Sequence, residues 1–240
     1  MLVICLRWAT RPLVPRAFGY VLAVAFRTAG ILPALFYYNP LVPTVRTRGN
    51  LPHWEEQNAI YFATFRLADS LPQSVLRAYE FEKQNIVRTA RQAGRPLSPS
   101  EEKRLEKLFS EKIQAKLDAG VGQCFLAKPE IADLVAEGLR HFDLSRYLMY
   151  AWCVMPNHVH ALFRMLSGCT LAEVLHTWKS YSATKANRLL RRSGQFWQRE
   201  YYDHIVRSED EFYRIVNYIL GNPKKAGLKN WRWGGINLRW

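Results

Sequence analysis

Two apolar runs near the middle of the chain are separated by a single turn signal, and this pattern limits the possible folds more than any other feature. The first run extends from Tyr147 to Met155, and the second run ends at Met165. Between them stand Pro156 and Asn157, residue types that are common in tight turns. The pattern therefore predicts two adjacent antiparallel strands.

The second of these strands begins with two histidines, His158 and His160. Alternate side chains of a strand point to the same face, so both imidazoles are expected on one side of the sheet. Neutral imidazole nitrogens bind divalent transition metals, and two of them form half of a site that leaves room for water and a substrate oxygen. The pair alone is equally compatible with two partly buried histidines that bond to the backbone.

The charge of the chain is uneven. The net charge is +14, and 49% of the residues are apolar, which indicates one folded domain with appendages. Residues 1–50 contain six arginines and no acid, residues 51–170 are nearly neutral, and residues 171–240 contain thirteen Lys or Arg against six acids. A basic C-terminal third favours a face that binds nucleic acid, with a merely solvated basic surface as the alternative. The four cysteines show no C-x-x-C spacing, which argues against a zinc ribbon or a disulfide framework and suits a reducing cytoplasm.

Three parts are expected along the chain: a weakly ordered basic extension at 1–50, a main domain at 51–228, and a Trp- and Arg-rich tail at 229–240. The apolar segment at 21–38 is interrupted by Arg27, Gly30 and Pro33, and it is too short for a clean membrane span, so no stable membrane partner is expected. A start codon placed upstream of the true one would explain this extension, and a signal or transit peptide is the alternative. The tail could stack on bases or cap the core.

The remaining periodicities predict one more strand and several helices. The strand is expected at 59–66, a short extended piece at 123–127, and helices at 73–93, 99–117, 129–142, 171–192 and 209–221. The helix at 171–192 opens with a capping box and carries cations suited to phosphate, and the aromatic segment at 195–204 could stack on bases or pack against the sheet. Residues expected to contact DNA in these regions and at the end of the last helix are Lys179, Lys185, Arg188, Arg191, Arg192, Trp197, Arg199, Lys224 and Lys225.

The last helix carries Tyr218 at the edge of its apolar stripe and Asn222 one turn later. A phenol with a pKa near 10 is a poor nucleophile at neutral pH, and it needs activation. A divalent ion held by His158, His160 and Asn222 would polarise a phosphate and lessen the repulsion of attack. An ordinary tyrosine at the edge of the core is the alternative interpretation of Tyr218.

Four motifs in this order, MPNHVH, WKSY, FWQREYYDH and YILGNPKKAGL, resemble those of the REP-associated tyrosine transposases. These are bacterial relatives of the single-strand transposases of the HUH superfamily, and the similarity covers about residues 51–228. The tail at 229–240 differs from the usual ending of the family, and residues 1–50 have no counterpart in it.

The resemblance implies an α+β, ferredoxin-like (RRM-like) antiparallel sheet backed by helices, as in HUH endonucleases. It implies metal ligation by His158, His160 and Asn222, with Mg²⁺ or Mn²⁺ as the ion, and attack by Tyr218 that leaves a 5′-phosphotyrosine and a 3′ hydroxyl. The implied substrate is single-stranded DNA at repeated extragenic palindromes folded as hairpins. A cytoplasmic, nucleoid-associated bacterial protein acting as a monomer or homodimer is expected.

Two other functions are open to such a chain. A hairpin-binding protein for DNA or RNA that has lost catalysis would keep the basic face, although retention of both histidines and of the tyrosine weighs against this. A metal hydrolase unrelated to nucleic acid is disfavoured, because position 162 is a leucine where a histidine-triad enzyme needs a third histidine.

Overall fold

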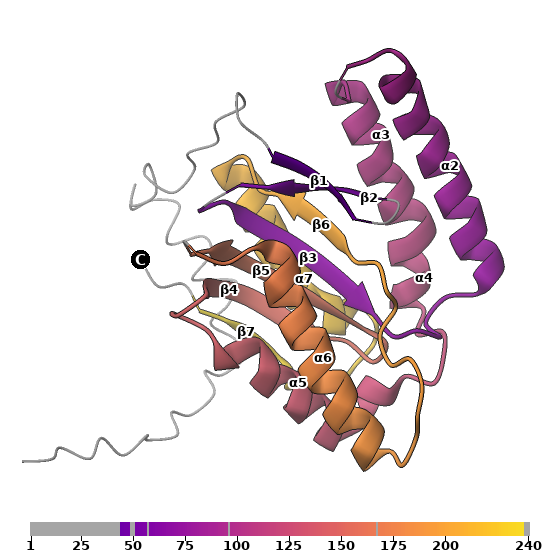
Figure 1. Ribbon diagram of the computed structural model, residues 1–240. Coiled ribbons are helices and arrows are strands. Elements are labelled where there is room, and N and C mark those ends of the chain that lie inside the picture. Colours follow the sequence, from indigo (N-terminus) through magenta and orange to yellow (C-terminus); the bar gives the residue numbers. More distant parts are fainter. Residues whose placement is uncertain (1–43, 49–50, 57, 96, 167, 238–240) are drawn as a thin grey trace, which may run out of the picture.

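The computed structural model describes residues 44–48, 51–56, 58–95, 97–166 and 168–237 (Figure 1). Its centre is a five-stranded antiparallel sheet with the strand order β6-β3-β5-β4-β7. The strands are β3 (Ile60–Arg66), β4 (Tyr147–Val154), β5 (His158–Met165), β6 (Tyr202–Ile205) and β7 (Gly234–Ile236). The two strands predicted around the Pro156 turn are β4 and β5, and their pairing as antiparallel neighbours is confirmed.

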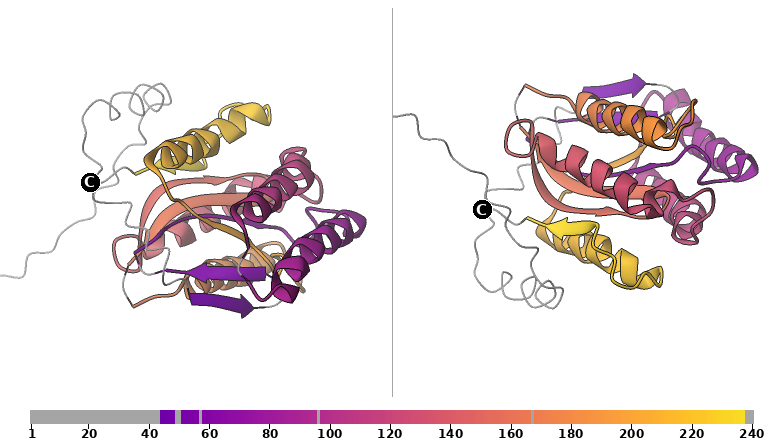
Figure 2. Two further views of the ribbon diagram at one scale, coloured as in Figure 1. Left: turned by 90° about the horizontal axis from the view of Figure 1, so that it is seen from above. Right: turned by 90° about the horizontal axis from the view of Figure 1, so that it is seen from below.

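The connections give the ferredoxin-like order that the resemblance implies. Helix α5 (Pro129–His141) joins β3 to β4 after an insertion, and helix α6 (Leu171–Leu189) joins β5 to β6. These two helices cover one face of the sheet, whereas helix α7 (Glu209–Lys225) covers the other face (Figure 2). The predicted α+β fold, an antiparallel sheet backed by helices, is therefore confirmed.

Side chains that alternate along the strands point into two separate hydrophobic cores, one on each face of the sheet. On the α5 and α6 side, Phe65, Phe163 and Trp178 pack together, and the indole N–H of Trp178 donates to the Tyr147 hydroxyl at 2.9 Å. On the α7 side, residues such as Leu162 pack against the apolar stripe of the last helix. Because the side-chain period of a strand is two, the histidines of β5 share the α7 side with Leu162.

A helical hairpin is inserted between β3 and α5, and it lies beside the sheet near β6 (Figure 1). It consists of α2 (Gln73–Gln92), α3 (Pro99–Phe109), a π-helical turn η1 (Ser110–Gln114) and α4 (Ala115–Asp118). Phe109 stacks on Tyr202 of β6 with ring centroids 3.8 Å apart, which anchors the returning arm of the hairpin to the sheet edge. A capping box forms at the start of α3, where Ser98 and Glu101 exchange hydrogen bonds.

The N-terminal boundary differs from the expectation. Strand β1 (Thr44–Arg48) pairs with β2 (Leu51–Glu55) in a separate two-stranded sheet, so the boundary expected after residue 50 falls between two paired strands. Residues 1–43 of the predicted extension lie outside the described residues. The predicted limits of two helices are accurate, because α2 and α5 each end within one residue of the predicted end.

Two local predictions are wrong. The last helix does not stop at Gly221 but continues through Pro223 to Lys225, because the amides of Ala226 and Leu228 bond back to the turn that contains the proline. The segment expected to be extended at 123–127 contains a 3₁₀ turn, η2 (Phe125–Ala127). Buried Leu126 anchors that turn, and its amide donates to the Pro156 carbonyl at 3.1 Å.

The described part of the tail packs on the body of the protein. The indole N–H of Trp231 donates to the Val154 carbonyl at 2.7 Å, and that of Trp233 donates to Asp133 at 2.8 Å. Strand β7 then pairs with β4 at the edge of the sheet. These contacts support a tail that caps the core and not one that stacks on bases.

Glu211 connects the start of α7 to β6, and its removal is expected to destabilise the protein. Burial raises the pKa of this carboxyl, but hydrogen bonds from His204 and from the Arg207 amide lower it more, to about 2. The stabilisation is therefore present above the unfolded pKa of 4.5 and is lost as the pH falls toward 2. We expect Glu211→Gln to cost about 1–2 kcal/mol at pH 7. Urea unfolding of both proteins should show a smaller difference at pH 3, and an unchanged difference would contradict this assignment.

Candidate active site

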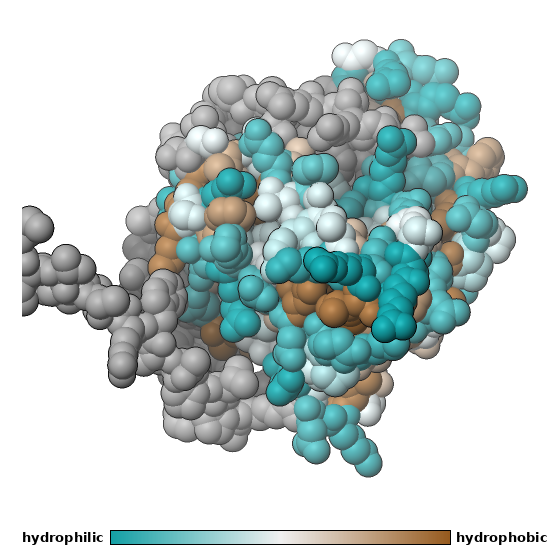
Figure 3. Space-filling view, turned by 60° about the horizontal axis from the view of Figure 1, so that its bottom comes forward, coloured by the Kyte–Doolittle hydropathy of each residue, from teal (hydrophilic) through white to brown (hydrophobic). Residues whose placement is uncertain are grey.

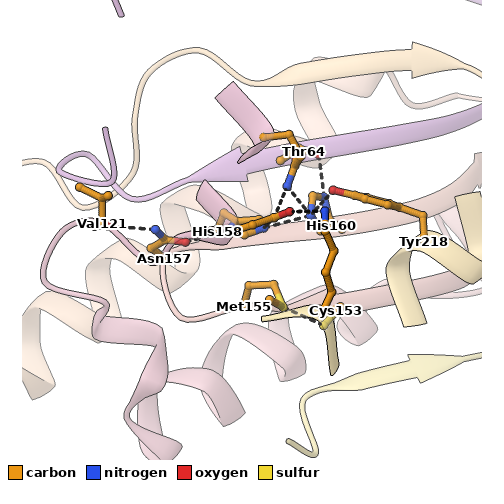
Figure 4. A network of polar contacts seen from close by, with 11 residues as sticks. Thr64, Val121, Cys153, Met155, Asn157, His158, His160 and Tyr218 are labelled. Atoms are coloured by element: carbon orange, nitrogen blue, oxygen red, sulfur yellow. Dashed lines mark hydrogen bonds and ion pairs between the residues drawn. The ribbon is translucent and has the colours of Figure 1, made fainter. Parts of the chain in front are cut away.

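The two histidines of β5 meet at their outer ring nitrogens, as predicted from their spacing. The Nε2 atoms of His158 and His160 are 3.0 Å apart, and both residues are fully buried (Figure 4). The Nδ1 atom of His158 contacts the Asn157 side-chain oxygen at 2.7 Å, and the Nδ1 atom of His160 contacts the Thr64 hydroxyl at 2.8 Å. A neighbouring side chain thus fixes each ring at its Nδ1 atom, and the two Nε2 atoms face each other.

The hydrogen bonds of Asn157 fix the tautomer of His158. The Asn157 amide nitrogen donates to the Val121 carbonyl at 2.9 Å, which leaves the amide oxygen to accept a proton from His158 Nδ1. The neutral ring of His158 then carries its lone pair on Nε2. This arrangement, an imidazole oriented by a hydrogen bond to its second nitrogen, is typical of histidines that bind metal ions.

Burial keeps both rings neutral. It lowers the pKa of His158 to about 4, even though the nearby Asp118 carboxylate acts in the opposite direction. Burial also lowers the pKa of His160 well below the ordinary value, and the charges of His158 and Lys225 act in the same direction. At neutral pH neither ring therefore carries a charge that would repel a cation, and the tautomer of His158 presents its Nε2 lone pair.

Helix α7 brings Tyr218 to the histidines. Its hydroxyl oxygen is 3.4 Å from His160 Nε2, and its ring meets the Phe62 ring edge-on with centroids 6.0 Å apart. In Figure 4 the tyrosine side chain points from the helix toward the imidazole. Burial raises the pKa of Tyr218 above its ordinary value, so this hydroxyl is protonated at neutral pH without a further group to activate it.

Asn222 follows Tyr218 by one turn, and it is buried on the same helix. Neither polar atom of its amide completes a well-formed hydrogen bond among the described residues, although the amide lies close enough to the Tyr218 hydroxyl to lower the pKa of that group. A buried amide without partners is costly, and it is common where a ligand or an ion completes the bonding. The structure thus brings His158, His160 and Tyr218 together on one face of the sheet, and it places Asn222 one turn beyond Tyr218 on the same helix.

Two further polar side chains reach this site from the inserted hairpin, and they are absent from the sequence-based site. The Gln114 amide nitrogen lies 3.3 Å from His160 Nε2 and 2.8 Å from the Asp118 carboxylate. Asp118 in turn lies 4.0 Å from His158 Nε2 and forms an ion pair with Lys225 at 2.9 Å. The inserted hairpin therefore forms one wall of the site.

The donor set fits a divalent ion. Two ligands about 2.1 Å from one ion and at right angles to each other are about 3.0 Å apart, which is the separation of the two Nε2 atoms. The residues that would hold the ion are His158 and His160, with Asn222 supplying an amide oxygen. Among the described residues no cluster of three His, Cys, Asp or Glu side chains could hold a metal ion, so an amide or a water has to complete the set.

The residues expected to contact DNA are divided between the two faces of the sheet. Lys224 and Lys225 are exposed at the end of α7, and Lys225 lies near the histidines, where it pairs with Asp118. The cations of α6 lie on the opposite side of the sheet, and on this side of the molecule hydrophilic side chains surround an apolar patch (Figure 3). Lys185, Arg188, Arg191 and Arg199 are exposed there or in the loop that follows α6.

Three residues of that set have a packing role in this structure. Trp197 is 4% exposed, and its indole N–H donates to the Ser182 hydroxyl at 2.9 Å, so it belongs to the core and is not a surface on which bases could stack. Lys179 donates to the Arg199 carbonyl at 2.7 Å, and burial lowers its pKa to about 8. Arg192 donates to the Gln195 carbonyl. These contacts hold the loop after α6 against the sheet.

The part of the chain that contains both histidines and Tyr218 is similar to a known protein family. Residues 128–222 match the family model described as transposase IS200 like. The matched segment begins at α5 and includes both histidines, Tyr218 and Asn222. The resemblance to tyrosine transposases that the motifs indicate is confirmed, whereas the inserted hairpin lies outside the matched segment.

Two proteins of Haemophilus influenzae are similar to parts of the chain. One, which is named provisionally as a REP-associated tyrosine transposase, is 23% identical over 101 residues, covering 36% of this chain and 57% of the relative. The other, named only as an uncharacterized protein, is 23% identical over 118 residues, covering 34% of this chain and 65% of the relative. The chain thus spans less than two thirds of the length of either relative.

Two solved structures are also similar. A REP-associated tyrosine transposase bound to a REP hairpin is 13% identical, with a TM-score of 0.43 and 76% of each chain covered. A transposase assigned provisionally in Deinococcus radiodurans is 15% identical, with a TM-score of 0.27, covering 75% of this chain and 98% of that chain.

Proposed function

We propose that this protein is a metal-dependent single-stranded DNA endonuclease and strand transferase, a transposase that uses Tyr218 as its nucleophile. The observation that carries the proposal is the convergence of three side chains. The Tyr218 hydroxyl lies 3.4 Å from His160 Nε2, which itself lies 3.0 Å from His158 Nε2. The family match over residues 128–222 supports the same activity.

In the proposed cleavage, the Tyr218 oxygen forms a bond to the phosphorus of a DNA phosphodiester. The bond from phosphorus to the 3′ oxygen breaks, and that oxygen takes up a proton to become a 3′ hydroxyl. The phenol loses its own proton, and the downstream strand stays attached as a 5′-phosphotyrosine. Attack of another 3′ hydroxyl on this linkage would reverse the step and join two strands.

The side chains around the tyrosine have distinct parts in this step. His158 and His160, neutral and oriented by Asn157 and Thr64, would hold a Mg²⁺ or Mn²⁺ ion together with Asn222. When bound, such an ion lessens the charge repulsion at the phosphate and favours loss of the phenol proton. Phe62 holds the tyrosine ring in place through its edge contact. All of these groups come from one chain, which supports cleavage in cis.

The proposed substrate is single-stranded DNA next to a hairpin, such as a repeated extragenic palindrome. Lys224 and Lys225 are exposed at the end of the helix that carries Tyr218, and they would contact the backbone phosphates there. The exposed cations of α6 would contact a different part of the nucleic acid, because they lie behind the sheet. Among the described residues, which do not include residues 1–43, no helix is long and apolar enough to traverse a bilayer.

The polarity of the covalent link tests the proposal. A hairpin DNA with a single-stranded foot is labelled at its 3′ end or at its 5′ end and incubated with the protein and Mn²⁺. The 3′ label is expected to migrate with denatured protein, and the 5′ label is expected in a shorter strand that a polymerase can extend. Transfer of the 5′ label to protein would contradict the proposed linkage. Hairpin binding without cleavage by any divalent ion would favour the catalytically inactive alternative.

A further inference from the structure

The outward face of helix α2 carries an exposed aromatic ring in a row of arginines. The Phe81 side chain is 67% exposed, more than any other large apolar side chain among the described residues. Positions 77, 81, 84, 88 and 91 follow a spacing of four and three, which places them on one side of the helix. We call this row the α2 stripe; its members, all exposed, are Arg77, Phe81, Gln84, Arg88 and Arg91.

The two acids of α2 do not neutralise the α2 stripe. Glu80 pairs with the buried Lys83 at 3.6 Å, and Glu82 pairs with Lys112 of the returning arm. None of the exposed residues of α2 is an acid, and the arginines of the stripe form no ion pair with a described side chain. These cations are therefore free to bind a polyanion.

The hairpin that carries the α2 stripe is anchored at the candidate site. The Gln114 amide nitrogen of its returning arm lies 3.3 Å from His160 Nε2. Helix α2 itself begins shortly after β3, whose last residue, Arg66, lies opposite His158 in the sheet (Figure 1). The stripe extends from there over about 20 Å along the helix axis, which is long enough for several nucleotides.

We propose that the α2 stripe binds single-stranded DNA that flanks the cleavage site, with the Phe81 ring stacked on an unpaired base and the arginines on backbone phosphates. An aromatic ring stacks on any base, and arginine binds phosphate oxygens through paired hydrogen bonds. Paired bases are stacked on one another and offer no open face to the ring, so the combination suits a single strand. The inference rests on the proposed function for the identity of the polyanion.

Fluorescence anisotropy with two hairpin DNAs tests the inference. Both have the same stem and short foot, and one is extended at both ends by about 12 unpaired thymidines. The full chain is titrated in EDTA so that no strand is cleaved. The extension should tighten binding by wild type. We expect Phe81→Ala to weaken binding of the extended DNA by about tenfold and of the short DNA by less than about twofold, and Phe81→Trp to restore the affinity.

Leu144→Ala is the matched control for loss of the aromatic ring. Leu144 is another large apolar side chain, 56% exposed, and it lies in the turn between α5 and β4. This variant should bind both DNAs as wild type does. Equal losses for the two DNAs in Phe81→Ala, or equal affinities of wild type for the two DNAs, would overturn the inference.

The salt dependence of binding tests the arginines. Arg77→Ala combined with Arg88→Ala should reduce the magnitude of the slope of log K against log salt concentration by about 1.4 on the extended DNA, because each phosphate contact to a single strand contributes about 0.7. The control combines Lys103→Ala with Arg104→Ala on α3, whose sequence contains three glutamates among its cations. It should leave the slope unchanged. The same reduction in both double variants would indicate a general effect of net charge and would overturn the inference.

A second copy of the chain is the other candidate occupant of the α2 stripe. If Phe81 holds a dimer, sedimentation of the free protein should show that Phe81→Ala is monomeric. Loss of a dimer with unchanged DNA affinity would overturn the inference. Wild type that binds the extended DNA through Phe81 but forms no Tyr218 adduct with Mn²⁺ would support the inference and contradict the proposed function.

Discussion

Tyr218→Phe is expected to abolish the covalent DNA adduct, with a loss of about 10³-fold or more in its rate of formation. The substitution removes one oxygen and keeps the ring, so the edge contact with Phe62 is retained. The melting temperature should therefore change little. The measurement is the appearance of a protein band that carries the 3′ label of a hairpin DNA in the presence of Mn²⁺.

Tyr213→Phe is the matched control for this prediction. Tyr213 lies on the same helix, where its ring packs against Phe212 in the core on the α7 side. This variant should form the adduct at a rate near that of wild type. Adduct formation by Tyr218→Phe, or its loss in Tyr213→Phe alone, would show that another residue attacks the DNA.

His158→Ala is the second variant with a large expected effect. It removes one of the two nitrogens that are proposed to bind the ion and that face each other at 3.0 Å, and it leaves the Asn157 side-chain oxygen without its partner. We expect Mn²⁺ affinity and the rate of adduct formation each to fall by about 100-fold. Hairpin binding without metal should persist, because the exposed cations are untouched.

His176→Ala is the control for the histidine prediction, since His176 is exposed on α6 on the other side of the sheet. Titration with Mn²⁺ should give the wild-type affinity for this variant. Unchanged Mn²⁺ binding in His158→Ala would contradict the assignment of the metal site to the histidines of β5.

Local sequence patterns were sufficient to predict the three central strands of the sheet and the convergence of the two histidines, whereas the edge strands β6 and β7 were not predicted. Alternation along β5 places His158 and His160 on one face, and the helical period of α7 places Tyr218 and Asn222 on the side of that helix nearest the site. Both patterns depend on neighbouring residues only. The motif resemblance then indicates that the strand and the helix act together.

The contribution of the inserted hairpin could not be predicted in the same way. Gln114 and Asp118 are spaced to share one side of a helix, but this spacing is also common on solvated surfaces. Their position next to His160 depends on the packing of Phe109 against Tyr202, a contact between distant parts of the chain. Likewise Trp197 was a candidate for stacking on DNA because composition does not show which aromatic side chains fill the core.

The proline in α7 shows how tertiary contacts can outweigh a local rule. The residue before a proline is biased away from helical geometry, which led to the expected end at Gly221. The last turn instead persists, and the ion pair of Lys225 with Asp118 lies within it. This extra turn also keeps Asn222 inside the helix and buried near the tyrosine.

The most direct test of the central claim is to locate the covalent bond. Wild-type protein is incubated with a hairpin DNA and Mn²⁺, and the adduct is digested with nuclease and protease and analysed by mass spectrometry. We expect a nucleotide phosphate on the side chain of Tyr218. A phosphate attached to any other residue, or cleaved DNA with no modified peptide, would contradict it.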